Sequence, residues 1–123
     1  MARLVTTLLA LALLATACDT ATPVIESTTR LQPTPDEVGP YQVDSVIIGA
    51  EDDLVQLYYV IGDQDHYLPV RMEADGERFS ALIPGQPRGT VISYFVAVVR
   101  DEVRVVSDPE AGGAAPYQFY IIE

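Results

Sequence analysis

Apolar and polar residues alternate along much of the chain after residue 40. In the run from 53 to 61, Val55, Leu57 and Tyr59 fall on one face and Gln56 falls on the other. Side chains of a β-strand point alternately to its two faces, so this period of two predicts a half-buried strand. The same pattern recurs, and the expected strands are 41–49, 53–61, 67–73, 77–83, 90–100, 102–107 and 117–122.

The run 90–100, TVISYFVAVVR, is apolar on both faces, which predicts a central strand that is covered on both sides. Turn-forming residues separate the runs every eight to twelve residues, and Asp75-Gly76 is typical of a hairpin. The pattern therefore predicts an all-β fold: a single two-sheet sandwich of about seven strands. The side chains of the central strand expected to point into the core are Ile92, Tyr94, Val96 and Val98, while Val91, Phe95 and Val99 should be covered by another part of the chain.

Four motifs between Leu54 and Asp101 carry a family resemblance. They are V-x-L-x-Y at 55–59, V-x-M at 70–72, F-x-A-x-I-P at 79–84 and G-T-x-I-x-Y-x-V at 89–96. This stretch resembles bacterial fibronectin type III and immunoglobulin-like modules. The resemblance implies an immunoglobulin-like sandwich, and because its motifs serve packing, it implies no activity.

The same resemblance implies a role for Tyr94. In such sandwiches an aromatic residue at this place forms a tyrosine corner, in which the hydroxyl bonds to backbone near the preceding connection. Two positions depart from the family pattern, since Val98 and Arg100 replace the usual Ala and Asp, and the chain has no Trp for the core.

The first 17 residues have the layout of a signal peptide. Arg3 supplies a positive charge, and the apolar run from Leu4 to Ala15 is about a dozen residues long. A membrane-spanning helix needs roughly 20 apolar residues, so this run fits a cleaved export signal better than an anchor. We therefore expect residues 1–17 to be a signal peptide.

Cys18, the single cysteine of the chain, directly follows Ala15-Thr16-Ala17. Small residues before a cysteine resemble the lipobox of bacterial lipoproteins, although Ala15 stands where Leu is usual. The resemblance implies that Cys18 is the site of lipid attachment, and two or three acyl chains such as palmitate make an anchor effectively permanent. The alternative is cleavage at an ordinary A-x-A site, which would release a soluble secreted protein with a free thiol.

Residues 18–39 are rich in Thr, Pro, Ser and acids and show no apolar period. Such a composition is typical of a flexible tether, and about 20 residues of this kind span roughly 25 Å on average. We therefore expect a lipid-anchored tether at 18–39 that lifts the domain clear of the membrane. The domain at 40–123 should then fold on its own.

The chain is strongly acidic, with 7 basic residues against 18 acidic ones. Removal of residues 1–17 takes away Arg3 alone, so the mature chain carries six arginines against eighteen acids, a net charge of −12. This charge argues against nucleic acid as a partner and against electrostatic binding to anionic lipid.

Catalytic and metal-binding patterns are weak. His66 is the single histidine, and no serine has the G-x-S-x-G setting of a nucleophile, so we expect no enzyme activity. Asp63-x-Asp65 resembles the start of a calcium loop but is followed by Tyr67-Leu68 in place of the required ligands. Neither a metal nor a cofactor is expected, although loop acids such as Asp52, Asp53 and Asp101 could meet in space.

Two hypotheses for function remain open. The first is a non-catalytic lipoprotein, anchored to a membrane of the bacterial cell envelope and exposed outside the cytoplasm. It would present an immunoglobulin-like domain for binding another envelope protein or for envelope assembly. The second is a small-ligand module for calcium or glycan, in which Tyr58, Tyr67, Tyr117 and Tyr120 would stack on sugar rings if they share an exposed face.

Overall fold

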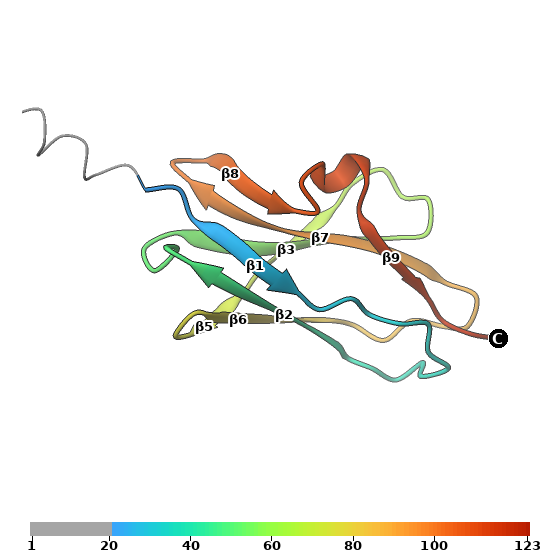
Figure 1. Cartoon of the computed structure of the whole chain (residues 1–123). Coiled ribbons are helices and arrows are strands. Elements are labelled where there is room, and N and C mark those ends of the chain that lie inside the picture. Colours follow the sequence, from blue (N-terminus) through green and yellow to red (C-terminus); the bar gives the residue numbers. More distant parts are fainter. Residues whose placement is uncertain (1–20) are drawn as a thin grey trace, which may run out of the picture.

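The computed structural model describes residues 21–123 as two antiparallel β-sheets packed face to face (Figure 1). The four-stranded sheet has the order β1-β2-β6-β5, and the five-stranded sheet has the order β4-β3-β7-β8, with β9 also pairing β7. This confirms the predicted all-β sandwich and is consistent with an immunoglobulin-like arrangement. The strands are β1 (Val24–Thr28), β2 (Tyr41–Ile48), β3 (Leu54–Ile61), β4 (Leu68–Arg71), β5 (Glu73–Asp75), β6 (Arg78–Ile83), β7 (Val91–Arg100), β8 (Val103–Asp108) and β9 (Tyr117–Tyr120).

The third expected strand is divided between the two sheets. Met72 separates β4, which pairs with β3, from β5, which pairs with β6. The Met72 side chain is buried, and its N–H donates to the carbonyl of Val55 at 2.9 Å. In this run Leu68 is exposed and Met72 is buried, and the chain crosses from one sheet to the other at Met72.

One edge of the five-stranded sheet consists of two strands in line. β8 pairs with Val96–Arg100 of β7, and β9 pairs with Val91–Tyr94 of the same strand. Between them the chain leaves the edge at 109–116 and forms a short 3-10 turn at Gly112–Ala114. This excursion lies against the outer side of β7, where it packs on Phe95.

The expectation of a flexible tether over residues 21–39 is wrong. β1 pairs with β2 through Val24↔Ile48, Ile25↔Ile47, Ser27↔Val46 and Thr28↔Ser45. Ile25 packs against the core, while Glu26 and Ser27 face solvent, so a five-residue edge strand has too few apolar positions to show a period. The domain therefore begins before Val24 and not at Pro40.

After β1 the chain crosses from the four-stranded sheet to the five-stranded sheet. Thr34 forms a parallel bridge with Ile121, in which the Ile122 N–H donates to the Thr34 carbonyl at 2.8 Å. The hydroxyl of Tyr94 lies at the crossing, where it donates to the Thr29 carbonyl at 2.7 Å and accepts from the Leu31 N–H at 2.8 Å. The N-terminal segment thus covers one long side of the sandwich.

The core lies between the sheets and follows the predicted alternation. Ile92, Tyr94, Val96 and Val98 of β7 are fully buried, as expected. The outer face of β7 agrees only in part, since Phe95 is buried whereas Val91 is 41% exposed. Other fully buried side chains of the core include Val43, Ile47, Leu57, Ile83, Phe119 and Ile121.

The Tyr94 hydroxyl makes two backbone hydrogen bonds, but they are not those of the expected tyrosine corner. Their partners belong to residues 29–31 of the N-terminal crossing, and not to the connection that precedes β7. Burial raises the pKa of the Tyr94 hydroxyl. Through these two bonds, Tyr94 fastens the N-terminal segment to the central strand.

Replacing Tyr94 by Phe should therefore lower the free energy of unfolding by about 1–3 kcal/mol, because the partly buried Leu31 N–H and Thr29 carbonyl lose their common partner. Tyr120→Phe is the matched control, since Tyr120 is 51% exposed and should be neutral. Urea unfolding measures both variants. Equal midpoints for the two would show that the Tyr94 hydroxyl contributes nothing.

Strand pairing places the connections at two opposite ends of the sandwich. The Ala21 end carries the start of β1 and the turns 49–53, 76–77 and 101–102. The Glu123 end carries the C-terminus and the connections 62–67 and 84–90 (Figure 1).

Candidate functional site

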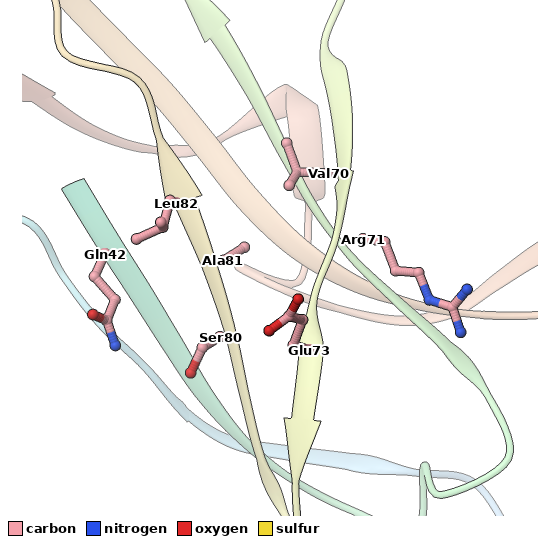
Figure 2. A pocket seen from close by; sticks show the side chains of 7 residues that line it. All are labelled: Gln42, Val70, Arg71, Glu73, Ser80, Ala81 and Leu82. Atoms are coloured by element: carbon pink, nitrogen blue, oxygen red, sulfur yellow. The ribbon is translucent and has the colours of Figure 1, made fainter. Parts of the chain in front are cut away.

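A hollow of about 400 Å³ opens on the long side of the sandwich that the N-terminal segment leaves uncovered. It lies between β6 in one sheet and the β4–β5 crossover between the sheets (Figure 2). We call it the groove. Its lining residues are Gln42, Val70, Arg71, Glu73, Ser80, Ala81 and Leu82.

Backbone groups of the groove are left without a strand partner. β5 pairs with β6 only over Arg78–Ser80, so β6 continues through 81–83 with an open side. The Glu77 carbonyl accepts from Ile47 of β2, and backbone direction alternates along a strand, so the N–H and C=O of Leu82 point away from β2. The order of the ladder thus directs the N–H and C=O of one β6 residue, Leu82, into the groove.

The opposite wall has a similar group. Met72 donates its N–H to β3, so by the same alternation the N–H and C=O of Arg71 point away from β3. Pro69, two residues earlier on the same edge, has no N–H to offer. Strand edges of this kind pair readily with another extended chain.

The polar side chains on the β2–β6 wall are already engaged with one another. The Ser80 hydroxyl donates to the Asp44 carboxylate at 2.6 Å, and the Gln42 amide donates to the same carboxylate at 2.9 Å. These bonds hold the pKa of Asp44 below its usual value. Leu82, which is 50% exposed, is the apolar side chain that this wall presents to solvent.

The Ala21 end holds an ion pair that also fixes the N-terminal segment. Arg100 donates from Nε and Nη2 to the two oxygens of Asp53, at 2.8 and 2.7 Å, and from Nη1 to the carbonyl of Ala21 at 3.0 Å. The hydrogen bond from Arg100 holds the pKa of Asp53 below its usual value. The Asp53 carboxylate is therefore committed to a guanidinium.

The loop acids considered for calcium do not gather around a common point. Asp53 binds Arg100, while Asp52 and Asp101 are exposed on separate turns. Asp63, Asp65 and His66 lie exposed on the connection 62–67 at the other end of the sandwich. Over residues 21–123, no three His, Cys, Asp or Glu side chains are close enough to hold a metal ion.

The four tyrosines considered for glycan binding do not share one exposed face. Tyr58 and Tyr67 pack on Phe95, with Tyr58 stacked at 4.8 Å between ring centres. The Tyr117 hydroxyl donates to Asp108, and burial together with this bond raises the pKa of Tyr117 to about 12. Tyr120 alone of the four is largely exposed.

Sequence reasoning predicted a cover over Phe95 but did not identify the small second core that forms there, on the outer face of the five-stranded sheet. It consists of Tyr58, Phe95 and Ala97, with Tyr67 packed against it. The Arg104 guanidinium lies over the Tyr58 ring at 4.5 Å and over the Phe95 ring at 5.1 Å. The apolar outer positions of the central strand were the signal for a cover, but nothing local showed that 109–116 would supply it.

Cys18, the predicted site of lipid attachment, and the expected signal peptide lie outside the described residues. Within residues 21–123, no helix is long and apolar enough to cross a membrane. No protein-family model matches the chain, and no curated protein matches it significantly.

Proposed function

We propose that this protein is a non-catalytic lipoprotein of the bacterial cell envelope, anchored through Cys18 and exposed outside the cytoplasm. Its sandwich domain, similar to immunoglobulin-like and fibronectin type III modules, binds an extended segment of another envelope protein. The proposal for the anchor rests on the sequence Ala15-Thr16-Ala17-Cys18. The proposal for the partner rests on the groove.

The observation that supports an extended peptide is the pair of free backbone groups that face the groove. Leu82 on one wall and Arg71 on the other each present an N–H and a C=O, which is what an added strand bonds to. The exposed Leu82 side chain offers apolar contact beside these groups. The Glu73 carboxylate points toward the groove, whereas the Arg71 guanidinium points away from it (Figure 2).

A photo-reactive residue at Gln42, on the exposed wall of the groove, tests this function in cells of the source bacterium. Irradiation should link the protein to one envelope protein, and the same reactive residue at Ile48, outside the groove on the same strand, should not. Leu82→Pro removes the outward N–H, and should abolish the adduct because the added strand loses that bond. Leu82→Ala keeps the outward N–H and should therefore retain most of the crosslinked adduct.

Strand addition at the groove and the lipid anchor at Cys18 are tested by separate measurements. An adduct that survives Leu82→Pro, in a protein shown by circular dichroism to be folded, would contradict strand addition. Cys18→Ala should move the protein out of the membrane fraction or leave it unprocessed. Mass spectrometry that finds a mature chain starting with unmodified Cys18 would contradict the anchor and favour the secreted form.

A further inference from the structure

The pairing of β5 with β6 defines where a strand added to the groove would lie. β5 pairs with β6 through Glu73↔Ser80, and two residues further the same register would bring Arg71 beside Leu82. Arg71 belongs instead to β4, where it pairs with Gln56 of β3. A strand that bonds to the free N–H and C=O of Leu82 therefore continues the line of β5 along β6.

The added residue opposite Leu82 would have two known neighbours on its own face. Leu82 and Ser80 lie on the outer face of the four-stranded sheet, because the residues on either side of them along β6 are buried, apart from the strand end. Glu73 lies on the same face, since residues directly opposite each other in a pair share one face. The added side chain would thus contact Leu82 and stand about 7 Å from Glu73, two positions along the line of β5.

Glu73 is a charged group of the groove without a cation of its own. Its carboxylate points toward the groove, while the Arg71 guanidinium points away (Figure 2). Arg78, on the neighbouring strand, pairs with Asp44 at 3.9 Å. The three ion pairs among residues 21–123 do not include Glu73. A positive side chain opposite Leu82 would therefore be attracted by a free carboxylate, and a negative one would be repelled.

We propose that the groove selects an extended segment with Arg or Lys opposite Leu82 and an apolar residue on either side, and that Glu73 sets this preference. The inference rests on strand addition at the groove and names the chemistry of the partner. The aliphatic stem of the basic residue lies on Leu82, which is 50% exposed, while its charged head reaches Glu73. The flanking residues point the opposite way, toward Val70 and Ala81 on the inner walls of the groove.

The same carboxylate disfavours the wrong partners. An apolar segment would partly desolvate Glu73 without neutralising it, and charged side chains at a strand edge oppose indiscriminate pairing. Glu73→Gln should therefore weaken the binding of basic segments and, at the same time, tighten the binding of apolar ones.

A random octapeptide library displayed on phage tests the preference with the purified full chain. Octapeptides that also bind folded Leu82→Pro are discarded, so those that remain depend on the outward N–H. These should carry Arg or Lys between two apolar residues far more often than the unselected library does. Octapeptides that depend on Leu82 but show no excess of basic residues would overturn the inference and leave strand addition standing. A library without any Leu82-dependent binder would contradict strand addition, and the inference with it.

Charge variants measure the contribution of Glu73 by fluorescence anisotropy with an enriched basic octapeptide. Glu73→Gln should raise the dissociation constant about threefold, as for an exposed ion pair, and Glu73→Arg about tenfold, because attraction becomes repulsion. Glu77→Arg is the matched control, since it makes the same charge change on the β5–β6 turn outside the groove, and its effect should stay below about twofold. An octapeptide with Glu in place of the basic residue should prefer Glu73→Arg to the unaltered protein. Equal effects of Glu73→Arg and Glu77→Arg would assign the attraction to overall charge and overturn the role of Glu73.

Discussion

A chain that begins at Pro40 should fail to fold cooperatively, whereas a chain that begins at Ala21 should melt in one transition. Truncation removes β1, so β2 loses its whole ladder on one side. It also removes Thr29 and Leu31, the two backbone partners of the fully buried Tyr94 hydroxyl. An unsatisfied buried group costs about 1–3 kcal/mol.

The lost apolar contacts add to this cost. Ile25 and Leu31 pack against the core, and burial of such a side chain contributes about 1.5–3 kcal/mol. Together these losses approach the whole net stability of a small domain, which is about 5–15 kcal/mol. Thermal melts followed by circular dichroism measure both chains. Equal melting temperatures would mean that residues 21–39 contribute nothing to the fold.

Gly85→Ala should lower the free energy of unfolding by about 3 kcal/mol, the upper end for an overpacked site. A Cβ at this position would lie 2.3 Å from the carbonyl oxygen of Val38 and 2.5 Å from that of Glu37. Both are backbone atoms, so two packed loops would have to separate. The same contact includes Gly39, whose own Cβ would lie 2.9 Å from the Cα of Gly85.

Gly76→Ala is the matched control for Gly85→Ala. Gly76 has a φ of +63° in the β5–β6 turn, and nothing lies within 4 Å of its added Cβ. The control therefore measures left-handed strain alone, about 1 kcal/mol. Chemical unfolding of both variants gives the comparison. If Gly85→Ala lowers the free energy of unfolding no more than Gly76→Ala does, the 36–40 and 84–88 loops are not packed together as described.

Periodicity predicted the strands that bury at least three side chains on one face. The runs at 41–49, 53–61, 77–83 and 90–100 correspond to β2, β3, β6 and β7 within a residue or two. It missed β1 because Glu26 and Ser27 interrupt the apolar pattern, and because a threonine- and proline-rich context is equally typical of a tether. An edge strand draws its stability from a neighbour that is distant in sequence, and a local window cannot contain that neighbour.

The candidate site was less accessible to sequence reasoning than the fold. The free N–H of Leu82 depends on where β5 stops, and this in turn depends on the crossover at Met72. The Arg100–Asp53 pair joins residues 47 positions apart, and neither has a motif around it. Candidate residues chosen by type alone, such as His66 and Asp63-x-Asp65, instead lie dispersed on an exposed connection.

The parallel bridge between Thr34 and Ile121 has a mechanical consequence. The N-terminal segment and the end of the chain lie side by side there, while Ala21 and Glu123 lie at opposite ends of the sandwich (Figure 1). A force that pulls these two termini apart acts along the strands, so it loads the Thr34–Tyr120 and Ile122–Thr34 hydrogen bonds in shear and at the same time. Bonds loaded together resist more force than bonds opened one after another. A domain held at its N-terminus and pulled from its far end would bear tension without opening from an edge.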